Sequence, residues 1–123
     1  MAYEIPGRKL TLPAAADLSA QQYRFVKVDG NGNAALAGNG DPAIGVLQNK
    51  PTSGQSAELE LNGGGGVSKV SFSGSIAPGT KIQSDANGNA VAYTSGVILG
   101  IVLEDGGALN QLGTVALLWG GTT

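Results

Sequence analysis

Hydrophobic and polar residues alternate, or gather in short runs, along nearly the whole chain. Glu58–Leu61 alternates strictly, and Val70 and Phe72 alternate with Ser71 and Ser73, as expected when one face of a strand is buried. Runs of this kind, separated by Gly, Asn, Asp and Pro, cover residues 23–28, 34–37, 43–48, 56–61, 67–73, 80–84, 90–93, 97–103 and 114–119. About nine short strands with regular turn signals predict an all-β domain, either a small β-barrel or a β-sandwich.

Two local features refine this pattern. The dipeptides Asn31-Gly32 and Asn87-Gly88 predict β-hairpins with type I′ turns, which need positive φ at both central residues. Residues Ala14–Gln22 follow Pro13 and fit either a short helix with proline at its first position or irregular coil. The pattern alone leaves both structures open for that segment.

Three blocks of the chain recur in the same order about 56 residues later, which indicates a tandem duplication. The matched blocks are Asp29–Ala34 with Asp85–Ala90, Ile44–Leu47 with Leu99–Val102, and Ser56–Leu61 with Thr114–Trp119. Two copies are too few for an open solenoid, which needs about three or more repeats to bury its faces. We therefore expect one domain over residues 14–123, with halves of about 14–66 and 67–123, preceded by an extended N-terminal arm over residues 1–13.

The two copies differ in polarity near their ends. In the alignment above, Glu58 and Glu60 give the first copy a wet strand face, whereas the second copy has Ala116 and Leu118 there. One interpretation is that the second copy supplies the central strands of the fold. The other is a contact between subunits through Leu118 and Trp119, because monomers seldom expose large apolar patches.

Composition limits the size of the core and the kinds of partner. The chain has 123 residues, of which 41% are hydrophobic, only 13% are charged and 21 are glycine. A modest core follows, so we expect self-association or a partner to add stability. The net charge of −2 and the lack of a basic stripe argue against nucleic acid as a partner. Residues 1–27 are nevertheless basic, with four Lys or Arg against two acids.

Other sequence features bear on the compartment. Cysteine is absent, which fits folding in a reducing cytoplasm. The N-terminus lacks the apolar core of a signal peptide, and no apolar run approaches the roughly 18 residues of a membrane helix. We therefore expect a soluble, unexported protein without a membrane partner.

Candidate catalytic groups are few. With no His and no Cys, neither a Ser-His-Asp nor a Cys-His arrangement can form. Glu58 and Glu60 would lie about 7 Å apart on one strand face, within the range of glycosidase carboxylates, but such pairs on polar strands are usually just solvated. The expectation is a protein that is not an enzyme.

Two glycine-rich motifs resemble ligand sites and fail on spacing. Gly63–Gly66 lacks the pattern of a phosphate loop, so we interpret it as a hinge between the copies. The Asp29 and Asp85 turns match the first three ligand positions of a calcium loop, but the twelfth position is Gly40 or Gly96 instead of Glu. Neither a metal nor a cofactor is expected.

The order and spacing of several low-complexity blocks resemble the head decoration, or capsid cement, proteins of tailed bacteriophages. The blocks are Ala14–Asp29, Ala43–Pro51, Val67–Val70, Ala77–Ile82 and Ser84–Ala90. The resemblance covers residues 14 to about 118. This chain departs from it in the Gly63–Gly66 run and at Thr80, where an acidic residue is usual, and both departures affect loop geometry.

The resemblance implies a structural protein of the virion exterior that is made in the host cytoplasm. Such proteins bind the major capsid protein at local symmetry points, often as homotrimers, and brace the mature shell; they are not enzymes and need no cofactor. We expect the arm to lie on the capsid and to add a strand to an exposed sheet edge; the alternative is a disordered tail. The expected capsid contacts are Tyr3, Ile5, Arg8, Lys9, Leu10 and Leu12.

A second hypothesis places the chain in another class, a receptor-binding or carbohydrate-binding β-module of a phage fibre or adhesin. Its binding loops would be Gly38–Asp41 and Gly106–Asn110. The low aromatic content, 5% of residues, counts against a sugar site, because such sites usually stack sugar rings on Trp or Tyr.

Overall fold

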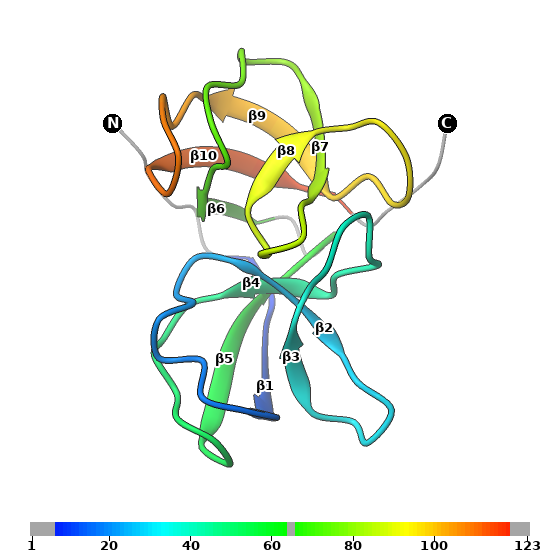
Figure 1. Ribbon diagram of the computed structural model, residues 1–123, viewed down its shortest axis with the longest axis vertical. Coiled ribbons are helices and arrows are strands. Elements are labelled where there is room, and N and C mark those ends of the chain that lie inside the picture. The colour runs from blue at the N-terminus through cyan, green and yellow to red at the C-terminus, as the bar shows by residue number, and fades with distance from the viewer. Residues whose placement is uncertain (1–6, 64–65, 119–123) are drawn as a thin grey trace.

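The protein consists of two five-stranded antiparallel sheets, one from each half of the chain (Figure 1). The computed structural model describes residues 7–63 and 66–118, which contain ten β-strands and no helix. In Figure 1 the second sheet lies above the first, and the chain passes between them once. The predicted all-β class and two-motif organisation are confirmed.

The strand order is the same in both sheets. The first sheet runs β1-β5-β4-β2-β3, with β1 (Lys9–Pro13), β2 (Phe25–Val28), β3 (Ala34–Leu36), β4 (Gly45–Leu47) and β5 (Ser56–Leu61). The second runs β6-β10-β9-β7-β8, with β6 (Val67–Ser71), β7 (Lys81–Ser84), β8 (Ala90–Ala92), β9 (Gly100–Glu104) and β10 (Leu112–Leu117). Identical topology in two consecutive halves is what a tandem duplication predicts.

Each sheet curves so that its two edges approach one another. A single parallel bridge joins Ala14 to Ala34 in the first half, and Phe72 is joined to Ala90 at the equivalent place in the second half. The edges pair at one bridge and not along their length. The fold is thus a pair of packed open sheets, the sandwich-like alternative, and not a closed barrel.

The pairing registers correct one part of the sequence alignment. Glu60 lies opposite Val46 in the first sheet, and Ala116 lies opposite Ile101 in the second. Glu60 therefore corresponds to Ala116, an offset of 56 residues and not the 58 assigned to the third block. A shift of two residues keeps each side chain on the same face, so the hydrophobic pattern could not reveal the error.

The two predicted hairpins form, but with a different turn. Asp29 accepts a hydrogen bond from the Gly32 amide, and its Oδ1 accepts from the amides of Asn31 and Asn33, both at 2.9 Å. Gly32 has φ +79°, whereas Asn31 is not in the left-handed region, so the loop is a type I turn followed by a glycine bulge. The loop of Asp85 repeats these bonds.

The segment after Pro13 is irregular coil. Leu18 is buried, and its amide donates to the carbonyl of Pro51 at 2.9 Å instead of to a residue one turn earlier. A tertiary contact has replaced the local bond that a helix would need. Of the two structures left open for Ala14–Gln22, the coil is the one observed.

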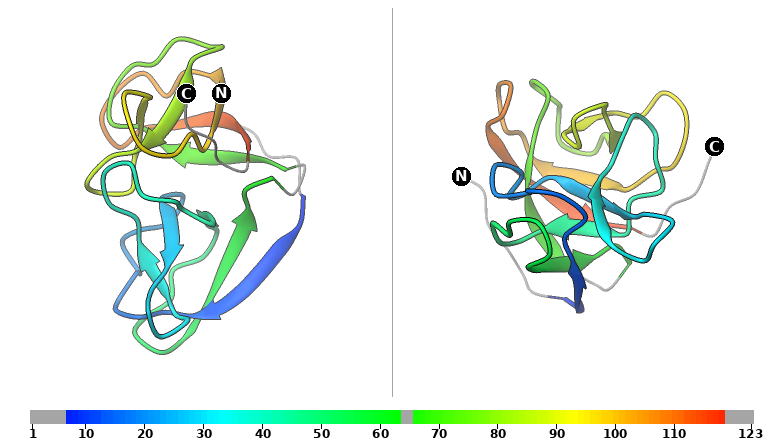
Figure 2. Two further views of the ribbon diagram at one scale, coloured as in Figure 1. Left: turned by 90° about the vertical axis from the view of Figure 1, so that its right-hand side faces the viewer. Right: turned by 60° about the horizontal axis from the view of Figure 1, so that its bottom comes forward.

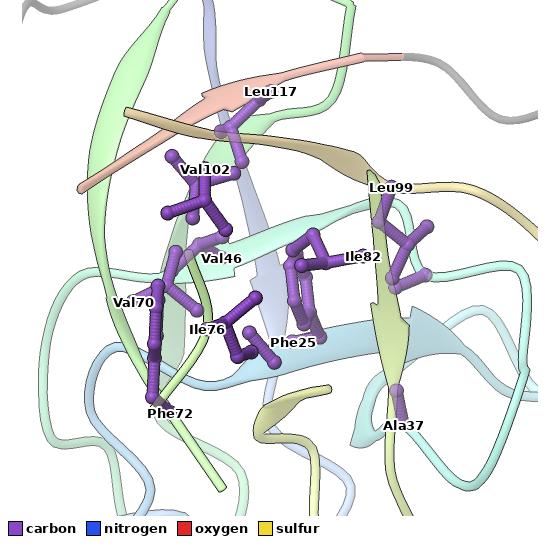
Figure 3. Packing of buried hydrophobic residues seen from close by; sticks show 13 residues of the cluster. Phe25, Ala37, Val46, Val70, Phe72, Ile76, Ile82, Leu99, Val102 and Leu117 are labelled. Atoms are coloured by element: carbon purple, nitrogen blue, oxygen red, sulfur yellow. The ribbon is translucent and has the colours of Figure 1, made fainter. Parts of the chain in front are cut away.

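The hydrophobic core has two unequal parts. A small cluster fills the first half; its buried members are Ala14, Leu18, Val26, Ala34, Leu47, Ala57 and Leu59. The larger cluster fills the second half and also takes in four residues of the first half, namely Phe25, Ala37, Ala43 and Val46 (Figure 3). The two halves therefore share one core and form a single packed body.

Because Phe25 is fully buried in the shared cluster, its truncation tests whether the halves unfold together. We expect Phe25→Ala to lower the free energy of unfolding by about 3–5 kcal/mol, and both halves to unfold in one transition. Urea denaturation followed by circular dichroism measures this. Val28→Ala, at an exposed position on the same strand, should change it by about 0.5 kcal/mol or less. Two separate transitions in the wild-type protein would contradict a shared core.

Candidate interaction surfaces

Strand β1 forms one edge of the first sheet. Residues Lys9–Pro13 pair antiparallel with β5, from Lys9 opposite Glu60 to Pro13 opposite Ser56 (Figure 2, left). The last five residues of the predicted arm are thus part of the sheet, and the first half begins at residue 9. Tyr3 and Ile5, two of the predicted capsid contacts, lie outside the described residues.

The other four predicted contacts divide between the core and the surface. Leu12 packs against the small core cluster, and Leu10 lies opposite the buried Leu59; both leucines are half-buried. Arg8 and Lys9 are exposed. Only the two basic side chains are therefore available to an outside partner, while the leucines hold β1 to its own sheet.

At Lys9 and Thr11, the outer edge of β1 has no backbone partner among residues 7–63 and 66–118. The Leu61 amide donates to the Arg8 carbonyl at 2.9 Å, and the Ala14 amide donates to the Gln55 carbonyl at 2.8 Å. In an antiparallel ladder these bonds direct even-numbered residues of β1 toward β5 and odd-numbered ones outward. Lys9 and Thr11 therefore point their N–H and C=O groups away from the sheet, whereas Pro13 has no N–H to offer.

Glu60 is buried, contrary to the wet strand face expected for it. Its side chain is 1% exposed, the Gly7 amide donates to its Oε2 at 2.6 Å, and Lys9 Nζ lies 4.0 Å from Oε1. Glu58 is the exposed member of the pair. The two carboxylates do not share one environment, because the N-terminal segment covers Glu60.

Equivalent rows of residues on the two sheets have opposite surroundings. Reading across the strands, the first row is Lys9, Glu60, Val46 and Phe25. The second row is Val67, Ala116, Ile101 and Lys81. The buried residues Val46 and Phe25 of the first row contribute to the shared core, whereas every residue of the second row is partly or fully exposed.

Two exposed leucines belong to this uncovered part of the second half. Strand β9, which contains the end of the apolar run Val97–Leu103, is the central strand of the second sheet, but β4 has the same place in the first sheet, so the second copy does not supply the central strands of the whole fold. Leu103 on that strand is nevertheless 41% exposed, and Leu118, just past β10, is 40% exposed. Trp119, the second predicted subunit contact, lies outside the described residues.

The seam between the halves contains the second hairpin. The Gly88 carbonyl accepts from the Phe25 amide at 2.8 Å, and a Cβ on Gly88 would lie 2.7 Å from Leu36 Cδ1. Arg24 reaches across to the Asn87 carbonyl. The equivalent Gly32 of the first hairpin has open space around it. Each half thus uses a different surface in the seam, and the counterpart of each surface stays uncovered.

The loops of the carbohydrate hypothesis have structural roles. In the Gly38–Asp41 loop, Asp41 Oδ2 accepts from Lys27 Nζ and from the Gly38 amide, both at 2.8 Å, and the Gly40 amide donates to Ser84 across the seam. In the Gly106–Asn110 loop, the Asn110 amide donates to the Phe72 carbonyl at 2.7 Å. Both loops are tied to the body of the domain.

The carboxylates of the calcium-like motifs serve their own turns. In residues 7–63 and 66–118, no group of three or more His, Cys, Asp or Glu side chains could hold a metal ion. Asp29 and Asp85, the first residues of the calcium-like motifs, stabilise their own hairpins through their carboxylates.

In the part of the chain that the structure describes, no helix is long and apolar enough to span a membrane.

Comparison with known proteins gives a fold neighbour. No protein-family model and no curated protein sequence matches the chain. A solved structure, the N base of the head fibre gp8.5 of bacteriophage phi29, matches with a TM-score of 0.70. The match covers 96% of this chain and 97% of that one at 17% sequence identity. At that identity, the likeness establishes a shared fold over almost the whole of both chains.

The ion pair in the Gly38–Asp41 loop predicts a pH dependence. The hydrogen bond from Lys27, followed by that from the Gly38 amide, lowers the pKa of the Asp41 carboxyl below its ordinary value of 3.8. A lowered folded-state pKa stabilises the protein above the ordinary value, and that stabilisation is lost as the pH falls. Asp41→Asn should therefore cost about 1 kcal/mol or less at pH 7, because the pair is partly exposed, and almost nothing near pH 2.

Urea denaturation of wild type and Asp41→Asn between pH 2 and pH 7 measures this difference. The double variant Lys27→Met/Asp41→Asn is the control. Once Asp41 has lost its charge, removing Lys27 as well should change the pH dependence of stability little further. A stability difference that stays constant over the whole range would show that the carboxylate charge has no part in holding the loop.

Proposed function

We propose that this protein is a non-enzymatic structural protein that binds the outer surface of a bacteriophage head and stabilises the mature shell. The observation that carries the proposal is the two-sheet fold shared with a phage head-fibre base over nearly the whole of both chains. The sequence resemblance to capsid decoration proteins, over residues 14 to about 118, points to the same location. On the virion exterior the protein would need neither a cofactor nor a nucleic-acid surface.

The proposed partner is the major capsid protein, and the proposed contact is the edge of β1. Lys9 and Thr11 offer outward backbone groups to an extended capsid segment, which would join the first sheet as a further strand. Arg8 and Lys9 are exposed beside that edge and would meet acidic groups of the shell. Tyr3 and Ile5 would extend the contact along the N-terminal segment.

We also propose that copies of the protein associate with one another. Within one chain, the first row of residues is covered by the second half, while the equivalent second row is open. A neighbouring copy that covers Ile101, Leu103 and Leu118 would remove this apolar surface from water. Trp119 follows directly in the sequence and would belong to the same contact. The resemblance to decoration proteins makes a homotrimer the proposed assembly.

A second candidate function follows from the name of the fold neighbour. That structure is the N base of a head fibre, so this fold also occurs in a fibre protein. A receptor- or carbohydrate-binding module of a phage fibre is therefore the alternative. Saturable binding to shells at a fixed ratio to the major capsid protein supports decoration, whereas binding on a glycan array with no binding to shells supports the alternative.

The shell contact is tested by co-sedimentation with undecorated heads of the source phage, before and after expansion. We expect saturable binding that prefers expanded heads. Thr11→Pro removes the outward N–H of β1 while leaving the bonds to β5 intact, and should weaken binding about tenfold or more. Thr11→Val, which keeps the N–H, should bind like wild type. Equal binding by the proline variant would reject the β1 edge, and no binding by wild type would reject the function.

The subunit contact is tested by measuring the mass in solution. Wild type should sediment as a trimer, and Ile101→Asp should shift the protein to a monomer, because a buried carboxylate without a partner opposes association. Val28→Asp is the matched control, an exposed apolar residue on the first sheet. Equal dissociation by both variants, or a monomeric wild type, would contradict the proposed interface.

A further inference from the structure

The buried carboxylate of Glu60 has no part in the functions proposed above. Its side chain lies beneath three segments that are far apart in the sequence: the N-terminal segment at Gly7, strand β1 at Lys9, and the connection between the halves at Gly66. The hydrogen bond from the Gly7 amide to Oε2, at 2.6 Å, is much shorter than the 4.0 Å between Lys9 Nζ and Oε1. A carboxylate is thus held where the chain enters its first sheet and leaves for its second.

The fold itself does not require this carboxylate. A buried charge costs free energy unless hydrogen bonds and opposite charge compensate it. The equivalent position in the second half is Ala116, which pairs with β6 and β9 in the same way as Glu60 pairs with β1 and β4. A small apolar residue therefore supports the same strand pairing, so the role of Glu60 lies in the segments that cover it.

Gly66 shows how closely the covering segments approach. A Cβ at this position would collide with Glu60 Oε2, and would also lie 3.1 Å from the Gly7 nitrogen. The Gly66 carbonyl in turn accepts from the Leu117 amide at 3.2 Å, which ties the connection to β10. Only glycine leaves room for the carboxylate between the N-terminal segment and the connection.

We propose that Glu60 is a latch that fixes the backbone at Gly7 to the junction between the halves, and so holds the neighbouring residues Arg8 and Lys9 in place. Gly7 is the first residue that the structure describes, and Arg8 and Lys9 follow it. The second part of this inference rests on the proposed function: by holding the chain at Gly7, Glu60 acts as a positioning residue for the shell contact of Arg8 and Lys9.

Amide hydrogen exchange, resolved by NMR, tests the latch in the full chain without any shell. The quantity is the exchange rate at Gly7 divided by that at Leu47, whose amide bonds to Arg24 and whose own rate reports any change in global unfolding. Glu60→Ala should raise this ratio about tenfold or more, because a hydrogen bond to a charged acceptor is lost. Glu60→Gln keeps an acceptor oxygen and should raise it less. Glu58→Ala, an exposed glutamate on the same strand, should leave it unchanged.

Gly66→Ala is a second route to the same result, because its methyl group displaces the carboxylate and leaves Glu60 itself in place. An unchanged exchange ratio in both Glu60→Ala and Gly66→Ala would overturn the latch. Co-sedimentation of the same variants with expanded heads tests the second part. Faster exchange at Gly7 together with weaker binding to heads supports both parts. Faster exchange at Gly7 with unchanged binding to heads supports the latch but overturns its role in shell contact. Failure of wild type to bind would reject the proposed function alone.

Discussion

The packing of one face of the first half against the interior of the second half is the interaction on which the structure depends. Phe25 and Val46 come from strands β2 and β4 of the first sheet, yet they belong to the cluster that fills the second half. Each sheet is small and closes at a single bridge. The first half has a modest apolar cluster of its own, mostly Ala, Leu and Val. The shared cluster joins two marginal units into one cooperative body.

Much of this fold could be predicted from the sequence. Period-two alternation and turn residues located the strands, and the Asn-Gly dipeptides located both hairpins. The turn type was predicted wrongly, because the Asp side chain accepts two backbone amides and stabilises a different turn. The register between the two halves was predicted wrongly, because the hydrophobic pattern does not contain the information that fixes it. A two-residue error in matching β5 with β10 leaves every side chain on its correct face, so only the pairing with β4 and β9 reveals it.

The candidate surfaces were harder to predict, because they depend on which segment covers which face. Glu58 and Glu60 are equivalent in a strand pattern, but the chain at Gly7 crosses only Glu60 and buries it. Leu10 and Leu12 were predicted to contact the capsid, but they lie on β1, which pairs with β5 of the same sheet. The exposed basic residues and the open face of β9 could be anticipated from charge and hydrophobicity, since no later segment of the described chain conceals them.

The seam between the halves also explains why a chain of two halves with the same strand order is asymmetric. Two copies related by a two-fold axis would bury the same surface from each copy, whereas here the first half contributes the row of Val46 and Phe25 and the second contributes its hairpin at Gly88. Such a contact is head-to-tail: it joins two different surfaces. Each half therefore keeps one surface whose counterpart is used in the seam but which is itself not covered. The sequence has diverged accordingly. The covered row carries Phe25, its open equivalent is Lys81, and the charged Glu60 is replaced by Ala116 where no N-terminal segment needs to be held. Divergence between the copies therefore follows the difference in what covers them.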